Sequence, residues 1–395
     1  MLYKTLTLKS REDRRIRAGH LWVYSNEIAV EKSPLKTFEP GEIARLCSAS
    51  GEPLGLVYVN PQSLITARLL TRDCSVVLGV EWLCVQLEHA LALREGLYDK
   101  PFYRAVHGEA DGLPGLVVDR YGSLLVVQVG TAGMEALRAD LLEALERVFA
   151  PEAILFRNDI ISRELEGLQQ SIEWGRGEVS GLVEIEEGGL RFAVDPLAGQ
   201  KTGWFFDQRE NRLGLRRFAQ GARVLDVCSY VGGWGVSAAV AGASDVLCVD
   251  ASAIALQQAQ ANAELNGVSL RVQQGDALQT LKALHSAGEQ FDVVVLDPPA
   301  LVKRKRDAKQ GMNHYRSLNQ WAMRLLGQSG VLVSCSCSHH LSSSQLQDVM
   351  LQAARQHGHE MQLLSRGQQG FDHPEHPAMP ETAYLKTIVA RVHHN

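Results

Sequence analysis

Residues 224–235 decide the fold, and they read Val224-Leu225-Asp226-Val227-Cys228-Ser229-Tyr230-Val231-Gly232-Gly233-Trp234-Gly235. An apolar run ends near an acidic residue, a short turn carries two adjacent glycines, and a segment rich in Ala and Gly follows. This order predicts a strand, a tight turn and a helix start, the place where an α/β sheet receives a nucleotide-like ligand. Glycines let the backbone approach such a ligand, and the helix start offers N–H groups. Because paired glycines are common in turns, the later strands must identify the ligand.

The next two strands are also followed by acidic residues. A buried strand over residues 246–250 ends at Asp250, where a carboxylate accepts hydrogen bonds from ribose hydroxyls. Asp276 follows the third strand, where an acceptor reaches an exocyclic adenine amine. Together these residues predict an adenosine-bearing cofactor over Gly232 and Gly233.

The fourth strand, residues 291–296, is followed by Asp297-Pro298-Pro299. A dinucleotide dehydrogenase has no need of this motif here. Nucleic-acid and related methyltransferases carry Asp or Asn followed by two prolines at this place, where the rigid loop presents polar groups to a target base. An NAD-binding module is therefore the weaker interpretation.

A further strand begins after Gly330 and brings Cys337 to its carboxyl end, on the edge that faces the ligand. A thiolate there can attack C6 of a pyrimidine and make C5 nucleophilic toward a methyl donor. The bland alternative, a small buried hydrophobe, is assigned to Cys335. A metal site formed with His339 and His340 is disfavoured, because the chain lacks a convincing second cluster of ligands.

Two basic segments are candidates for RNA contact. The loop expected to run from Lys303 to Arg316 holds six basic residues against one acid, beside the predicted site. Near the N-terminus, basic residues precede Gly19-His20-Leu21-Trp22-Val23, and cations beside aromatic rings suit phosphates and unpaired bases. A solvated basic face with a core tryptophan explains the second segment at least as well. Asp372 and His373 are a weaker candidate for a substrate loop.

Composition bounds the class of protein. The 395 residues carry a net charge of −5, distributed as +3 over residues 1–75, −11 over 76–190 and +3 over 191–395. Seven scattered cysteines do not suggest a disulfide framework, and no run of about 18 apolar residues predicts a membrane span. These features predict a cytoplasmic α/β protein with no membrane partner and no bound metal.

Three domains are expected. Residues 1–75 show short alternating runs and turn signals typical of a small β-barrel. Residues 76–185 alternate helix and strand in a small α+β domain, in which the carboxylates of Gly108 to Gly115 are assigned no chemistry. Residues 186–395 form a Rossmann-like α/β domain.

Over its whole length the chain resembles the RlmI-like class of S-adenosylmethionine-dependent large-subunit rRNA methyltransferases, which carry a PUA domain first. The matching motifs are Gly19 to Val23, Gly108 to Gly115, Lys201-Thr202-Gly203 to Arg209, Ser229 to Gly233, Asp297-Pro298-Pro299 and Ser336-Cys337-Ser338. The chain departs from the family's usual Pro-Pro-Lys-Phe at Ala300 and Leu301, so a lysine role there is not carried over.

The resemblance implies 5-methylcytosine formation in rRNA, on naked or protein-poor RNA, by a chain that could form a homodimer. Cys337 is then the nucleophile, and Asp297 holds the base. Besides Gly232, Gly233, Asp250 and Asp276, the implied S-adenosylmethionine site includes Asp226, Tyr230, Asp297 and Arg209. Three alternatives remain: a guanine-N7 methyltransferase, a non-catalytic RNA-binding assembly factor and a small-molecule methyltransferase, the last disfavoured by the N-terminal barrel.

Overall fold

The computed structural model describes residues 3–394, and the chain divides into two compact units. The first unit consists of Met1–Val183, Asp195–Phe206 and Phe371–Thr382. The second unit consists of Glu184–Val194, Asp207–Gly370 and Ala383–Asn395. Each unit therefore contains segments that are far apart in the sequence. The boundaries expected at residues 75 and 185 stay a prediction.

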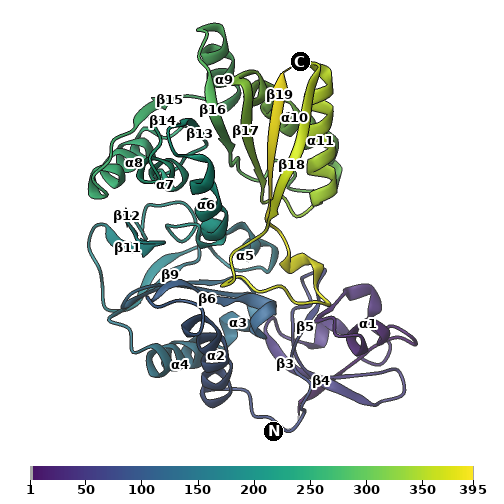
Figure 1. Cartoon of the computed structure of the whole chain (residues 1–395). Coiled ribbons are helices and arrows are strands. Elements are labelled where there is room, and N and C mark those ends of the chain that lie inside the picture. The colour runs from purple at the N-terminus through teal and green to yellow at the C-terminus, as the bar shows by residue number, and fades with distance from the viewer. Residues whose placement is uncertain (1–2, 395) are drawn as a thin grey trace. The chain divides into compact units, whose positions relative to one another are not determined.

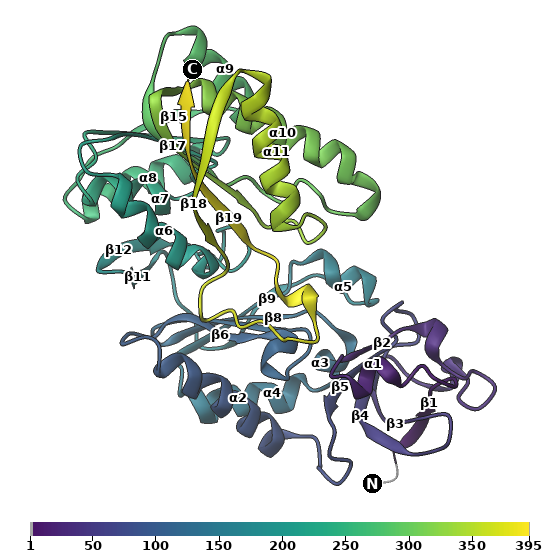
Figure 2. The same ribbon diagram turned by 45° about the vertical axis from the view of Figure 1, so that its right-hand side comes forward.

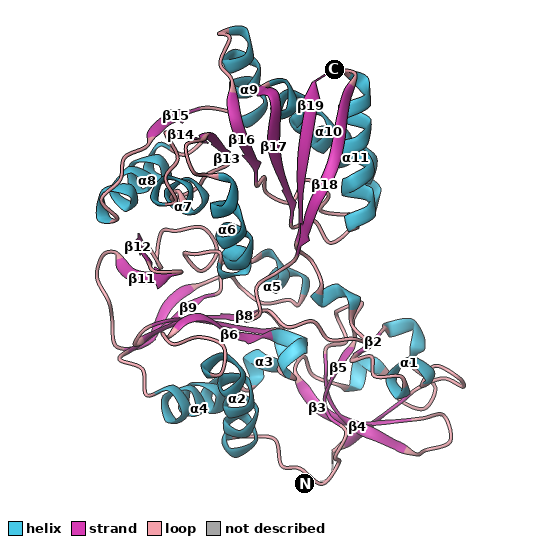
Figure 3. Cartoon of the chain, in the orientation of Figure 1, coloured by secondary structure: helices cyan, strands magenta, loops and turns pink. Residues whose placement is uncertain are grey.

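The first unit begins with a five-stranded sheet in the order β1-β3-β4-β5-β2, in which β1 runs parallel to β3. Figure 3 labels β2, β3, β4 and β5 of this sheet and draws the strands in magenta. Its strands are β1 (Lys4–Thr7), β2 (Trp22–Val23), β3 (Glu42–Cys47), β4 (Pro53–Val59) and β5 (Ala67–Thr71). Apolar residues such as Leu6, Leu46 and Val57 are buried in a core of their own. The expected all-β character is confirmed, with a short helix α1 (Arg14–Arg17) added.

A second five-stranded sheet follows in the same unit, in the order β10-β9-β8-β7-β6. Its strands are β6 (Phe102–His107), β7 (Leu116–Tyr121), β8 (Leu124–Val129), β9 (Ala153–Arg157) and β10 (Ile172–Arg176). Helices α2 (Val80–Glu95) and α4 (Arg138–Phe149) pack against each other and lie together beside this sheet, as Figures 1 and 2 show. Two shorter helices, α3 (Ala132–Ala136) and α5 (Ile161–Leu165), connect its strands.

The second unit contains a seven-stranded sheet in the order β15-β14-β13-β16-β17-β19-β18. Its strands are β13 (Arg223–Val227), β14 (Asp245–Asp250), β15 (Arg271–Gln274), β16 (Phe291–Leu296), β17 (Leu326–Ser336), β18 (His359–Gly367) and β19 (Lys386–His394). The first five strands run parallel, and β19 pairs antiparallel with both β17 and β18. Strand order reverses at β13, so the edge beside β13 and β16 is the expected ligand site.

Helices cover this sheet, as expected from its parallel strands β13, β14 and β16, whose residues are mostly buried. They are α6 (Arg209–Leu215), α7 (Gly233–Val240), α8 (Ala253–Leu265), α9 (Ala277–Ser286), α10 (Ala308–Arg324) and α11 (Ser343–Gln356). Helices α10 and α11 pack side by side, and α7 packs between α6 and α8 (Figure 1). β11 (Val183–Glu187) and β12 (Leu190–Val194) form a two-stranded hairpin, and β12 packs on α8. The predicted Rossmann-like arrangement is confirmed.

Candidate active site at the carboxyl edge of the second sheet

The glycine turn between β13 and α7 is held against the end of β14. The backbone N–H groups of Cys228 and Ser229 both donate to the Val249 carbonyl, at 2.8 and 3.1 Å. Cys228 and Tyr230 have φ angles of 64° and 50°, the left-handed region that side chains disfavour by about 1–2 kcal/mol per residue. Backbone strain of this kind persists where surrounding contacts hold it, and it is concentrated at ligand sites.

Gly232 closes the turn with a φ of 83° and caps the start of α7. A Cβ atom at this position would lie 2.8 Å from the Ala259 Cβ of α8, closer than real side chains approach. Glycine is therefore required both by the backbone conformation and by the close packing of α8. Gly233 follows as the first residue of α7, so the turn and the helix start present their backbone together.

Asp226 lies beneath this turn and is completely buried. Its Oδ2 accepts the Gly235 N–H at 2.9 Å, and the Cys248 thiol lies 3.8 Å away. Burial raises the pKa of Asp226 to about 7. This geometry supports a role in holding the first turn of α7, and a direct contact with the cofactor stays a prediction.

The two predicted adenosine contacts lie at the ends of the adjacent strands β14 and β15. Asp250 accepts the Tyr230 N–H and the Ser252 N–H, each at 2.9 Å, so its carboxylate also fastens the glycine turn. Asp276 is exposed and caps α9 by accepting the Gln279 N–H at 3.0 Å. Both carboxylates retain lone pairs for further donors, because each oxygen can accept more than one hydrogen bond.

Asp297 follows β16 and receives two side-chain hydrogen bonds. Gln208 donates to its Oδ1 at 2.9 Å, and the Trp234 indole donates to its Oδ2 at 3.0 Å. Burial raises the pKa of Asp297 to about 6, although both donors act in the opposite direction. The sequence alone does not predict Gln208 and Trp234 as partners of Asp297, although both stand inside motifs described above.

Cys337 directly follows β17, the strand next to β16, so it lies at the same sheet edge as Asp297. Its side chain is half-buried, whereas Ser336 and Ser338 on either side are buried. Cys335 is completely buried and accepts the Thr387 hydroxyl at 3.3 Å, as expected for a core cysteine. The structure thus brings the predicted nucleophile and the predicted base-holding residue to neighbouring strand ends.

Arg209 is buried at the start of α6, beside the β11–β12 hairpin. Its Nε lies 3.5 Å from Glu187, and Arg212 forms a closer ion pair with the same carboxylate at 2.7 and 2.8 Å. This geometry supports a role for Arg209 in anchoring the hairpin. Its contact with the cofactor stays a prediction.

The basic segment after Asp297 is only partly the loop that was expected. Helix α10 begins at Ala308, so Lys309 and Arg316 lie on a helix. Residues 303–306 are exposed, and within residues 3–394 only Arg306 of these four forms an ion pair, a 3.8 Å contact with its neighbour Asp307. Their positive charge is therefore available to a phosphate backbone.

The basic residues at the N-terminus are more fully neutralised. Lys4 pairs with Glu42, Arg15 with Glu27, and Arg17 with both Asp13 and Glu52. The Trp22 indole donates to Glu109 at 2.8 Å, and the Arg68 guanidinium lies over its ring. The solvated-face interpretation therefore gains support here.

Two other acidic groups of the first unit have structural roles. Asp111 forms a two-pronged ion pair with buried Arg94, both distances being 2.7 Å, in line with the absence of assigned chemistry. Asp372 and His373 are buried in the same unit, where the Arg104 N–H donates to Asp372. The contribution of Asp372 and His373 to a substrate loop stays a prediction.

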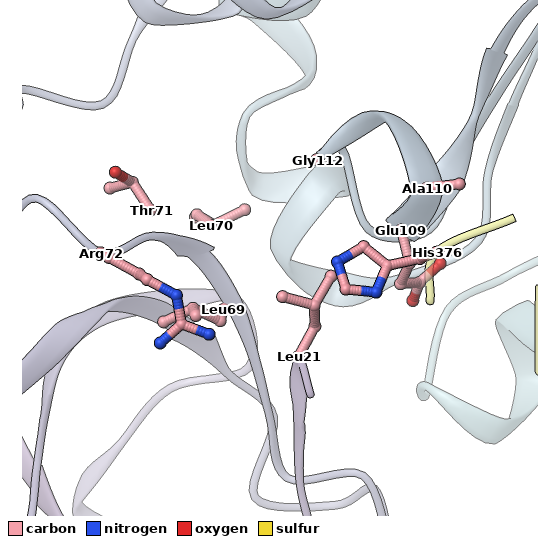
Figure 4. A pocket seen from close by; sticks show the side chains of 9 residues that line it. All are labelled: Leu21, Leu69, Leu70, Thr71, Arg72, Glu109, Ala110, Gly112 and His376. Atoms are coloured by element: carbon pink, nitrogen blue, oxygen red, sulfur yellow. The ribbon is translucent and has the colours of Figure 1, made fainter. Parts of the chain in front are cut away.

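The first unit also contains a pocket of about 290 Å³, shown in Figure 4. Its lining comes from the residue before β2, from β5 and the residue after it, from the Gly108 turn and from the returning C-terminal segment. The lining residues are Leu21, Leu69, Leu70, Thr71, Arg72, Glu109, Ala110, Gly112 and His376. The mixture of leucines with Arg72 and Glu109 gives it both apolar and charged walls.

In the part of the chain that the structure describes, no His, Cys, Asp or Glu cluster could hold a metal ion, and no helix could cross a bilayer.

Comparisons with known proteins agree with this architecture. Residues 6–72 match the PUA-like domain family, and residues 113–391 match the S-adenosylmethionine-dependent methyltransferase family. A relative from Erwinia tasmaniensis, named Ribosomal RNA large subunit methyltransferase I, is 35% identical over 99% of this chain and 100% of its own length.

Two solved structures have the same fold. One is a putative SAM-dependent methyltransferase from Streptococcus mutans, with a TM-score of 0.83 and 18% identity, covering 98% of this chain and all of that one. The other is a putative methyltransferase complexed with SAH, also at 0.83 and 18%, covering 99% of this chain and all of that one.

Proposed function

Because the chain belongs to the S-adenosylmethionine-dependent methyltransferase family, among relatives named Ribosomal RNA large subunit methyltransferase I, we propose that it methylates C5 of a cytosine in large-subunit rRNA. The observation that carries this proposal is the placement of Asp297 and Cys337 at the ends of the neighbouring strands β16 and β17. A carboxylate and a thiol at one edge suit addition to a pyrimidine ring better than simple transfer to a nitrogen.

The residues at the carboxyl edge fit S-adenosylmethionine. A side chain at Gly232 would clash with Ala259, so only glycine lets the turn pack closely on α8. The bare backbone of the turn can also approach a bound cofactor closely. Gly233 begins α7, whose first N–H groups suit a carboxylate or another electronegative group. Asp250 and Asp276 supply acceptors for ribose hydroxyls and an adenine amine. When bound, the cofactor supplies an electrophilic methyl group.

Cys337 and Asp297 divide the remaining chemistry. The Cys337 sulfur adds to C6 of the cytosine, which places electron density on C5, the atom that receives the methyl group. Asp297 is held by Gln208 and Trp234 and positions the base. With a pKa of about 6 it is mostly ionised at neutral pH, so it is also the candidate that removes the C5 proton. Departure of the sulfur then restores the ring.

The substrate is proposed to be naked or protein-poor rRNA, because the target base must leave its stack to reach the sheet edge. Residues 303–306 would contact the phosphate backbone near the reacting base. A homodimer is part of the same proposal, and light scattering coupled to gel filtration measures it directly.

The decisive experiment uses large-subunit rRNA fragments that contain 5-fluorocytosine, which blocks loss of the C5 substituent. The wild-type protein should form a covalent complex that survives denaturation, and Cys337→Ala should form none. Cys335→Ala is the matched control. It removes a buried thiol from the same strand, two residues before Cys337, and this variant should still form the complex. Methylation that persists in Cys337→Ala would contradict the nucleophile, and mass spectrometry that finds 7-methylguanosine would favour the guanine-N7 alternative.

A further inference from the structure

Lys386 is a buried cation that the steps above do not use. It is the first residue of β19 and lies directly opposite Ser336 of β17, with about 9% of its surface exposed. A lysine is rarely buried unless its ammonium group is hydrogen-bonded. Its presence beside the strand end that carries Cys337 therefore calls for a physical reason.

The ammonium group of Lys386 is directed at the turn that contains Cys337. Its Nζ donates to the Ser338 carbonyl at 2.6 Å and to the Tyr384 carbonyl at 2.8 Å. Ser338 is the residue immediately after Cys337, so the lysine grips the turn at the peptide that follows the thiol. The charge of Cys337 also acts on Lys386, where it favours the protonated ammonium form of the lysine.

The other side of the same turn is held by hydroxyl groups. The Ser336 hydroxyl donates to the Tyr315 hydroxyl at 2.9 Å, and the Tyr315 and Ser338 hydroxyls lie 3.1 Å apart. The Val302 N–H donates to the Ser338 hydroxyl at 3.1 Å, which ties the turn to the segment after Asp297. Cys337 is thus the half-buried residue between two buried serines that are both held in place.

We propose that Lys386 is a positioning residue for the proposed nucleophile: it anchors the turn through Ser338 and holds the Cys337 thiolate by its positive charge. The Sγ–H bond breaks with the proton passing to solvent, and the sulfur keeps the electron pair that later bonds to C6. Tyr315 supplies the uncharged half of the clamp. The role of Cys337 as a nucleophile rests on the proposed function. The effect of Lys386 on the ionisation of the Cys337 thiol does not, because it can be measured without RNA.

The surroundings agree with this division of roles. Burial lowers the pKa of Lys386 to about 8, while the charge of Cys337 opposes that change. Tyr315 on α10 has a raised pKa because of burial, so it stays a neutral hydrogen-bonding group at physiological pH. Other titratable groups near the pair include Cys335 on β17, Asp297 after β16 and Tyr384. The Tyr384 hydroxyl donates to Asp207 at 2.6 Å, and the ring of His339 lies 5.7 Å from that of Tyr384.

The test measures alkylation of Cys337 by iodoacetamide between pH 6 and 10, with the modified peptide quantified by mass spectrometry. In the wild-type protein the midpoint, which is the pH at which the alkylation rate is half-maximal, should lie below the pKa of about 8.5 that is typical of a free cysteine. Lys386→Met should move the midpoint up by about one pH unit and slow alkylation about tenfold at pH 7. Lys282→Met on α9 is the matched control and should leave the midpoint unchanged.

Tyr315→Phe separates geometry from charge, because it removes a hydroxyl and leaves Lys386 in place. It should slow the 5-fluorocytosine adduct while keeping the alkylation midpoint. Calorimetric binding of S-adenosylmethionine verifies that each variant is folded, and the wild-type profile decides the matter if Lys386→Met does not fold. A wild-type midpoint at or above 8.5, or equal shifts in Lys386→Met and Tyr315→Phe, would overturn the proposal. Methylation that persists in Cys337→Ala would instead remove the proposed function and leave the alkylation result standing.

Discussion

Substitution of Gly232 by alanine tests how closely the cofactor turn is packed. A side chain at a φ of 83° costs about 1–2 kcal/mol. The added Cβ would also lie 2.8 Å from the Ala259 Cβ and 3.2 Å from its Cα, and overpacking of this kind costs about 1–3 kcal/mol. The free energy of unfolding of the second unit should therefore fall by about 2–5 kcal/mol. Because the turn must shift away from α8, the affinity for S-adenosylmethionine should fall by at least about tenfold.

Gly267, which follows the C-terminal end of α8, provides the matched control. It has a φ of 71°, but a Cβ there would meet no atom within 4 Å. Gly267→Ala should thus lose only the conformational part, about 1–2 kcal/mol, and should bind the cofactor normally. Guanidinium denaturation followed by circular dichroism measures the first quantity, and titration calorimetry measures the second.

An equal loss of unfolding free energy in Gly232→Ala and Gly267→Ala would refute this reasoning. It would mean that the contact of the turn with α8 adds nothing to the cost of the Gly232 substitution. A double variant refines the comparison. Ala259→Gly removes the Cβ that would clash, so in its presence Gly232→Ala should cost less than in the wild-type background. Recovery should be partial, because the Ala259 Cα also lies within contact distance.

Three further outcomes are expected. Arg212→Leu leaves the buried Glu187 carboxylate with a weaker partner and should cost about 3–5 kcal/mol in guanidinium denaturation, whereas Glu184→Gln, in an exposed pair on the same hairpin, should cost at most about 1 kcal/mol. The pKa of Asp226 is raised from 3.8 to about 7 in the folded state, so this carboxyl increasingly lowers the free energy of unfolding as the pH rises from about 4 to 7. Asp226→Asn should lose this pH dependence, which denaturation curves recorded across that range measure. The same pH dependence in the variant and the wild type would contradict the prediction. Replacing residues 303–306 by glutamine should lower the salt dependence of RNA binding, measured by filter binding, by about three in the logarithmic slope, and an unchanged slope would exclude phosphate contact.

The strand ends of the second sheet could be predicted because each signal is local. Parallel buried strands are short apolar runs, and the acid or cysteine that follows a run marks the carboxyl edge. Asp250, Asp297 and Cys337 were all placed on this basis, before any pairing between strands was known. The turn at Gly232 was equally evident, because its required backbone conformation restricts the residue type.

The supporting residues could not be predicted, because their partners are distant in the sequence. Trp234 lies 63 residues from Asp297, and Gln208 lies 89 residues from it. Lys386 reaches the Cys337 turn only because β19 inserts antiparallel beside β17. No periodicity in the sequence predicts the register of β19 against β17. The start of α10 is not predicted for a different reason: a cluster of like charges favours a loop, whereas the packing of the helix outweighs the local repulsion.

The returning segment Phe371–Thr382 has a consequence for biosynthesis. Arg94 in the first unit is completely buried, and it donates to the Asp372 carbonyl at 2.8 Å. That partner belongs to the segment of the first unit that is synthesised last, roughly 190 residues after Val183, where the unit's first stretch ends. At about 5–20 residues per second, the ribosome needs on the order of 10–40 s to deliver it. During that interval the nascent first unit carries an incompletely satisfied guanidinium, and the unit can close only after the returning segment has been made.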